Sequence, residues 1–201
     1  MLDKAAQTLL RPVMVRTARV LCRLGVTADA LSWTGFVLGM GAAVTIASGQ
    51  FLVGLALLLA SRLMDGLDGA VARATQPTDR GGFLDITLDF VFYASIPLAF
   101  AVEDPDANAL AAAVLLASFI GTGSSFLAFA IVAEKRRLQS LAFPDKSFYF
   151  LGGLTEATET LAAFVAMCLW PQWFAEIAYG FAALCVITTA LRIGWGYAAF
   201  R

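Results

Sequence analysis

The sequence of 201 residues contains no histidine and few charges: 14% of its residues are Asp, Glu, Lys or Arg, whereas 60% are apolar. A soluble domain has about 25% charged and about 45–50% apolar residues, so we expect this chain to lie in a lipid bilayer. Without histidine, any general base or metal ligand has to be a carboxylate, hydroxyl or thiol. The three cysteines, Cys22, Cys168 and Cys185, show no CxxC spacing and are predicted to be buried hydrophobic residues.

Long apolar runs predict an all-α integral membrane protein with six membrane-spanning helices, since each span needs about 20 apolar residues. The expected spans cover residues 29–48, 51–74, 82–102, 108–133, 148–169 and 174–198. Before them, residues 4–24 mix basic and apolar side chains, a pattern typical of an amphipathic helix on the membrane surface. We expect one domain over residues 1–201, with an interfacial helix in residues 1–25 and the six-helix membrane bundle in residues 29–198.

Lysine and arginine residues predict the orientation of the spans, because positively charged connections stay in the cytoplasm. Five basic residues precede the first span, and the first, third and fifth connections contain none. The others at span ends or in connections are Arg73, Arg80, Lys135, Arg136, Arg137, Lys146 and Arg201. Both termini are therefore expected in the cytoplasm. A bacterial source would place the protein in the inner or plasma membrane.

Four aspartates in the second and third spans are expected to meet. Asp65 and Asp68 are spaced i,i+3, and Asp85 and Asp89 are spaced i,i+4, so each pair shares one helical face. A rise of about 1.5 Å per residue puts the first pair roughly 21 and 25 Å from the outer end of its span. The second pair lies about 6 and 12 Å from the cytoplasmic end of its own span. All four therefore fall in the cytoplasmic third of a core about 30 Å thick.

The energetic cost of these carboxylates indicates a function. Each costs at least about 2.5–3.5 kcal/mol to insert, so four cost on the order of 10–14 kcal/mol, as much as the whole stability of a typical domain, about 5–15 kcal/mol. Ionised carboxylates also repel one another unless cations lie among them. Arg62 and Arg73 are the basic residues nearby in sequence, and two divalent ions would balance the charge. The structural alternative is that these aspartates form salt bridges or line a water-filled cavity.

Oxygen ligands favour Mg²⁺ or Mn²⁺, and paired ions of this kind promote in-line phosphoryl displacement. Neighbouring residues fit such chemistry. Gly66, Gly69 and Ala72 remove side chains from a helix surface that a nucleotide phosphate would have to approach. Arg73, one turn further on, can make bidentate contacts with a phosphate.

The run D-x-x-D-G-x-x-A-R, seven further residues, and G-x-x-x-D-x-x-x-D occupy residues 65–89. This pattern resembles the signature of the CDP-alcohol phosphatidyltransferases, integral membrane enzymes with six spanning helices, although the spacer commonly has eight residues. The resemblance implies that Asp65, Asp68 and Asp85 hold two metal ions. It implies that Asp89 helps to hold one of them and acts as the base that deprotonates the acceptor hydroxyl.

The same resemblance assigns substrate-binding residues. It implies that Gly69, Arg73 and Thr78 contact the cytidine diphosphate group. Upstream, residues 27–32 read T-A-D-A-L-S, which is similar to the family's T-P-N-x-[LV]-[ST] but lacks the proline and has aspartate for asparagine. The implied substrate-binding residues here are Asp29 and Ser32. The alternative is that both are ordinary residues at a helix N-terminus.

The acceptor pocket is expected in the last three spans. Glu156, expected inside the fifth span, is a candidate to line it, since acids within a membrane are functional by default; its alternative role is to pair with Arg192 or Arg62. Arg137 or Lys146 is a candidate to bind an acceptor phosphate, although such residues also mark membrane surfaces. Basic residues would suit glycerol phosphate or inositol phosphate, and a glutamate would suit serine, choline or ethanolamine. The sequence does not choose between them.

The expected function is transfer of a phosphatidyl group from a CDP-alcohol, with CDP-diacylglycerol as first candidate, to a small polar alcohol, with release of CMP. Nucleic acid is not an expected partner, and a homodimer is a candidate assembly. A transporter or cation pathway is the alternative, and it would distribute acids through the membrane with access from both sides. A third interpretation, a relative without activity that serves as a scaffold, fits poorly with four intact aspartates.

Overall fold

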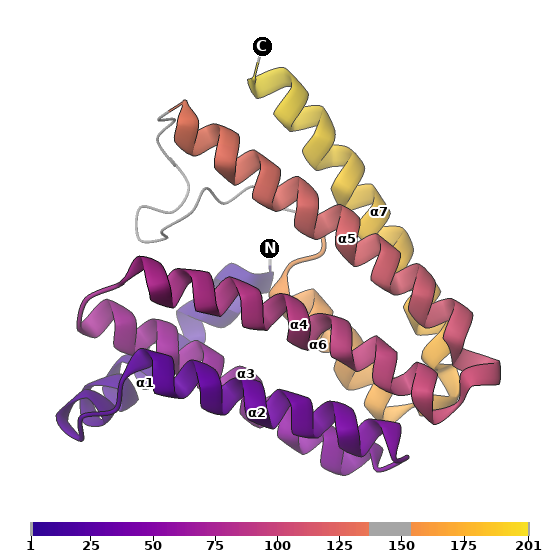
Figure 1. Ribbon diagram of the computed structural model, residues 1–201, viewed down its shortest axis with the longest axis horizontal. Helices are drawn as coiled ribbons and strands as arrows, with labels where there is room; N and C mark the ends of the chain where they lie inside the picture. The colour runs from indigo at the N-terminus through magenta and orange to yellow at the C-terminus, as the bar shows by residue number, and fades with distance from the viewer. Residues whose placement is uncertain (1, 137–153, 201) are drawn as a thin grey trace.

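The computed structural model describes residues 2–136 and 154–200, and this part of the chain is helical without any β-strand (Figure 1). Short connections of one to four residues join most neighbouring elements. The elements are α1 (Leu2–Arg23), α2 (Ala28–Ala47), α3 (Phe51–Ala74), α4 (Asp79–Glu103), α5 (Pro105–Lys135), α6 (Ala157–Leu169), a 3-10 turn η1 (Pro171–Trp173) and α7 (Phe174–Ala199).

Local sequence signals explain where these helices begin. The Thr27 hydroxyl accepts a hydrogen bond from the backbone N–H of Ala30 and caps α2, as expected for a threonine at this position. Asp104 caps α5 in the same way, and Pro105 follows it at the first helical position. Gly25 has a φ of +77°, a conformation that few other residues adopt, and it separates α1 from α2.

The expected helices are largely confirmed. The bounds of α2, α3, α4, α5 and α7 differ from the predicted spans by at most three residues. By length and composition, four helices in the described part of the chain could cross a membrane: α2, α4, α5 and α7 together with η1. α3 has 24 residues but carries several charged side chains. The count of six spans and the cytoplasmic termini stay predictions.

The predicted fifth span was wrong where the structure describes it. Residues 154–156 are not helical, and α6 begins only at Ala157. Glu156 therefore caps α6 instead of lying two turns inside a helix. Its backbone N–H donates a 3.1 Å hydrogen bond to the Glu159 side chain, as part of a capping box that starts the helix here. Residues 148–153 of the expected span lie outside the described residues.

The helices form two groups that separate toward one end. Figure 1 shows α2, α3 and α4 side by side, with α5 and α7 running together above them. The two groups meet where α4 turns into α5, and they diverge toward the other end of the molecule. α1 packs against α3 through a small apolar cluster that includes Ala18, Leu67 and Val71.

Aromatic residues fill the end where the two groups meet. Phe100 of α4 stacks on Phe51 of α3 and on Phe174 of α7, with ring centroids 5.7 and 4.5 Å apart. Phe92 and Phe164 continue this core toward the middle of the molecule, and both are buried. The apolar core therefore closes one end of the helix bundle, and the aspartates on α3 and α4 lie toward the other end.

Glycines on α2 bring it close to its neighbours. A Cβ atom at Gly35 would lie 3.2 Å from the Cβ of Met64 on α3, and one at Gly39 would lie 2.5 Å from Cδ2 of Phe92 on α4. On α5, a Cβ at Gly121 would lie 3.2 Å from the hydroxyl of Thr189 on α7. The close approach at Gly35 brings the N-terminal part of α2 within hydrogen-bonding distance of Asp68 on α3.

Candidate active site

Three of the predicted aspartates form a cluster between α3 and α4. Asp65, Asp68 and Asp85 each offer a carboxylate oxygen, and these atoms lie within 4.8 Å of one another. The i,i+3 spacing on α3 turns the first two carboxylates to the same face. Asp85 reaches this cluster from the first turns of α4. Three convergent carboxylate oxygens are a donor set suited to a hard divalent cation such as Mg²⁺ or Mn²⁺.

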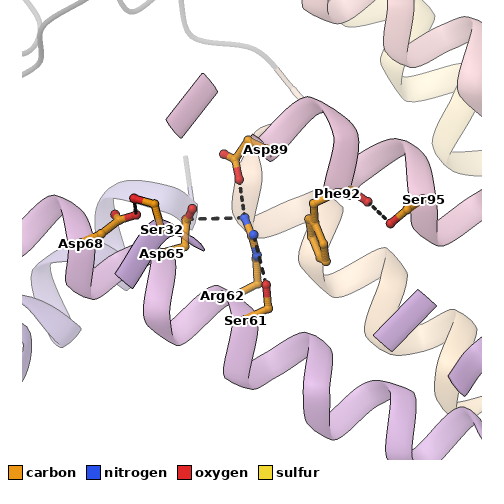
Figure 2. A network of polar contacts seen from close by, with 8 residues as sticks. All are labelled: Ser32, Ser61, Arg62, Asp65, Asp68, Asp89, Phe92 and Ser95. Atoms are coloured by element: carbon orange, nitrogen blue, oxygen red, sulfur yellow. Dashed lines mark hydrogen bonds and ion pairs between the residues drawn. The ribbon is translucent and has the colours of Figure 1, made fainter. Parts of the chain in front are cut away.

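The cluster is tied to α2 through Ser32. Its hydroxyl donates a 2.5 Å hydrogen bond to Oδ2 of Asp68 (Figure 2). Asp68 is only 5% exposed, and a buried carboxylate needs such a donor. Ser32 therefore lies at the site, because it contacts a predicted metal ligand.

Asp89, the fourth predicted ligand, is paired with an arginine. Nη1 of Arg62 lies 2.6 Å from Oδ1 of Asp89 and 3.5 Å from Oδ2 of Asp65. Figure 2 shows the guanidinium between the two carboxylates. The sequence places Arg62 near the aspartates, but only the packing of α3 against α4 reveals this contact, since the two paired residues are 27 positions apart.

Two cavities share several of these side chains as lining residues. All four aspartates line the small one, together with Ser32 and Arg62. Asp68, Asp85 and Asp89 also line a large cavity of about 1240 Å³ between the two groups of helices. Ligand pockets commonly measure about 300–1,000 Å³, so this cavity has room for more than one small substrate.

The residues expected to bind the donor lie on one wall of the large cavity. Gly69, Arg73, Thr78 and Asp29 all line it. A Cβ atom at Gly69 would lie 3.1 Å from Nη1 of Arg73, so the guanidinium lies over the glycine. The Thr78 hydroxyl accepts a 3.1 Å hydrogen bond from the N–H of Gly81 and thereby caps α4.

Two details of this wall were not expected. Asp29 forms a 2.5 Å ion pair with Arg80, which links the start of α2 to the start of α4 at the rim of the cavity. The interpretation of Gly66 was wrong. A Cβ there would meet Cε of Met14 on α1 at 3.5 Å, so this glycine lies against α1, whereas Gly69 and Ala72 line the cavity.

The opposite wall contains the candidate acceptor residues. Glu156 lines the large cavity together with Arg192 of α7. The hydroxyl and the N–H of Thr155 each donate a hydrogen bond to Thr188, at 3.0 and 3.1 Å, and so hold the start of α6 against α7. Arg137 and Lys146 lie outside the described residues.

Arg192 also lies on this wall, and the sequence did not predict that it would contact a substrate. It is 8% exposed, and its Nη1 donates a 3.0 Å hydrogen bond to the carbonyl oxygen of Thr122. Its Nε is buried and has no hydrogen-bond partner among the described residues. An arginine in an apolar helix is itself a signal of function, and it could have been counted with the candidates.

Comparisons with known proteins identify the family. The sequence profile of the family described as CDP-alcohol phosphatidyltransferase matches residues 25–193. The inner membrane protein YnjF of Escherichia coli is 49% identical over 201 residues, covering all of this chain and 98% of that protein. An archaetidylinositol phosphate synthase of Methanothermobacter thermautotrophicus is 47% identical over 81 residues, 39% of this chain and 42% of that enzyme.

Solved structures share the fold. The structure of a phosphatidylinositol phosphate synthase of Mycobacterium tuberculosis with CDP-DAG bound has a TM-score of 0.73 at 21% identity. The match covers 92% of this chain and 94% of that one. A structure of the same enzyme with manganese and citrate has a TM-score of 0.70 at 22% identity, over 92% of this chain and 88% of that one.

Proposed function

Because the chain belongs to the CDP-alcohol phosphatidyltransferase family, we propose that this multi-pass membrane enzyme transfers a phosphatidyl group from CDP-diacylglycerol to a small polar alcohol. The products are a phospholipid and CMP. One observation carries the proposal: three carboxylate oxygens lie within 4.8 Å of one another at the wall of a cavity of about 1240 Å³. The known enzyme class and this arrangement favour transfer chemistry over the alternative of a transporter or cation pathway.

Asp65, Asp68, Asp85 and Asp89 would hold two divalent ions, Mg²⁺ or Mn²⁺. When bound, such ions neutralise the diphosphate and the negative charge that develops on the leaving group. The donor set fits them, since all the candidate ligands are hard carboxylate oxygens. Ser32 keeps the buried Asp68 in place through its hydrogen bond.

Residues of the chain orient the two substrates. Arg73, above Gly69, binds the diphosphate, and Thr78, Asp29 and Ser32 complete the donor wall. Asp89 lines both cavities and takes the proton of the acceptor hydroxyl. The acceptor oxygen then forms a bond to the phosphorus of the phosphatidyl group as the bond from that phosphorus to CMP breaks.

The acceptor binds at the wall formed by Glu156 and Arg192, with Arg137 and Lys146 as further candidates. Arg192 is a buried cation that lines the cavity, and a phosphate on the acceptor would complement its charge. Inositol phosphate is the first acceptor to test, because relatives and structural neighbours are named as inositol phosphate lipid synthases.

Six spans with both termini in the cytoplasm complete the proposal, so that the site faces the cytoplasm. Basic residues on the connections support this orientation. Cysteine substitutions in cysteine-free protein test it: a reagent that does not cross membranes should label residue 79 only after the cells are opened, and residue 106 in intact cells. Labelling of residue 79 in intact cells would contradict it. A homodimer is proposed as the assembly.

The activity is tested with purified protein, CDP-diacylglycerol, Mg²⁺ or Mn²⁺ and a panel of alcohols. The panel contains inositol phosphate, glycerol phosphate, serine, choline and ethanolamine. We expect CMP release that needs both a divalent ion and one of these acceptors. If no acceptor supports CMP release and the protein binds neither CDP nor CMP, the enzyme proposal is wrong and the transporter alternative gains support.

A further inference from the structure

Arg62 lies beside the candidate base and is held there from several sides. Its side chain is 12% exposed, and it sits on α3 one turn before Asp65. Nη1 contacts Asp89 at 2.6 Å and Asp65 at 3.5 Å. Nη2 donates a 3.3 Å hydrogen bond to the hydroxyl of Ser61, which is fully buried.

An aromatic platform fixes the plane of this guanidinium. Cζ of Arg62 lies 4.0 Å from the ring centroid of Phe92, and 5.5 Å from that of Tyr93. Phe92 is 1% exposed and packs against Phe164 of α6. Since the ring cannot move without disturbing the apolar core, the arginine is held in one place between the core and the carboxylates (Figure 2).

The charge of Arg62 acts on the carboxylates in two ways. An arginine inside a membrane protein is tolerated where it pairs with acids, and here it pairs with two of the four aspartates. Its positive charge lowers the mutual repulsion of the cluster. The same charge repels a divalent cation at the cluster and engages Oδ1 of Asp89, an atom that a cation would otherwise attract.

We propose that Arg62 is a positioning residue for the transfer reaction: it holds the Asp89 carboxylate toward the cavity and weakens the attraction of the four aspartates for divalent ions. The effect of Arg62 on turnover rests on the proposed function. Its effect on ion affinity rests on the ion pairs alone. Because the guanidinium fixes Oδ1 of Asp89, the second oxygen, Oδ2, is left for the acceptor hydroxyl and for a metal ion.

The test compares Arg62→Met, Arg62→Lys and the wild type by Mn²⁺ titration calorimetry and by CMP release. Arg62→Met removes the charge at similar volume, so we expect Mn²⁺ to bind at least threefold more tightly. We also expect kcat to fall at least tenfold while KM for CDP-diacylglycerol changes less than threefold. Arg62→Lys keeps the charge but loses the planar, forked guanidinium. Its Mn²⁺ affinity and its kcat should both lie between those of the wild type and those of Arg62→Met. Arg16→Met on the exposed face of α1 serves as the control for loss of an arginine.

Thermal unfolding provides a second readout. In EDTA, Arg62→Met should unfold at a lower temperature than the wild type, because Asp65 and Asp89 lose the cation with which they pair. Saturating Mn²⁺ should narrow that difference. Weaker Mn²⁺ binding in a folded Arg62→Met, or an equal loss of stability with and without Mn²⁺, would overturn the inference. If the wild type binds Mn²⁺ yet releases no CMP, the proposed function is wrong. The comparison of Mn²⁺ affinity between Arg62→Met and the wild type then still tests the effect of Arg62 on ion binding.

Discussion

The hydroxyl of Ser32 on α2 lies 2.5 Å from the carboxylate of Asp68 on α3. The contact joins the segment that follows α1 to the aspartate cluster, across 36 residues of sequence. Gly35, one turn further along α2, allows this approach because a larger residue would meet Met64 of α3. Changes at the start of α2 should therefore affect the aspartate cluster.

Replacing Ser32 by alanine should weaken ion binding. A hydrogen bond to a charged group contributes about 1.5–3 kcal/mol, so we expect the Kd for Mn²⁺ to rise at least about tenfold and the midpoint of Mn²⁺-dependent CMP release to rise with it. Thr34→Ala is the matched control, because the Thr34 hydroxyl bonds only to the Ala30 carbonyl on the same helix in the described contacts. Equal Mn²⁺ affinity in both variants would contradict this role of Ser32.

Asp89→Asn should abolish turnover without unfolding the protein. The amide keeps the shape of the side chain but cannot accept a proton from the acceptor, and loss of a general base costs about 10²–10⁴-fold in rate. CMP release is the measurement, with circular dichroism and gel filtration as tests of folding. Asp79→Asn, an exposed change in the first turn of the same helix, is the control. Retained turnover in Asp89→Asn would remove this residue as the base.

Gly69→Ala should impair binding of the donor. The added methyl group would lie 3.1 Å from Nη1 of Arg73, and it would displace the guanidinium from the wall where the diphosphate is proposed to bind. We expect KM for CDP-diacylglycerol to rise about tenfold, the effect of about 1.4 kcal/mol, with the acceptor KM nearly constant. Gly180→Ala on α7, with no atom within 4 Å of the new methyl group, is the control. A selective effect on the acceptor would argue against the assignment.

Gly39→Ala should destabilise the helix bundle. Its Cβ would lie 2.5 Å from Cδ2 of the buried Phe92 ring, and overpacking of this kind costs about 1–3 kcal/mol. The measurement is the thermal midpoint of unfolding in detergent. Gly41→Ala on the same helix is the matched control, since its nearest neighbour is Leu57 at 3.6 Å. A midpoint equal to that of the control would show that α2 and α4 separate easily.

The aspartate cluster could be predicted because helical spacing and the antiparallel order of consecutive spans decide it. Asp65 and Asp68 share a face of α3, and α4 returns antiparallel to α3 with Asp85 at a matching depth. Most helix bounds follow in the same way from apolar runs and from caps such as Thr27. These features depend on a few consecutive residues, which a single sequence displays.

Other features depend on contacts between distant residues and could not be predicted. The pairing of Arg62 with Asp89 and the place of Arg192 opposite the aspartates require the packing of helices far apart in sequence. Gly66 was misread because its side of α3 is covered by α1, and periodicity does not say which neighbour covers a face. α6 begins later than predicted because a capping box between Glu156 and Glu159 starts the helix at Ala157, although the apolar pattern predicted an earlier start.

The stacked rings of Phe51, Phe100 and Phe174 have a consequence for the membrane as a whole. They close the bundle at one end, so in the proposed reaction a lipid donor would approach the carboxylates from the half of the bilayer beside the open end. The lipid product would then leave into that same leaflet. In the proposed reaction each turnover would replace one lipid of that leaflet by another, and arrival of the product in the other leaflet would depend on separate proteins that move lipids across.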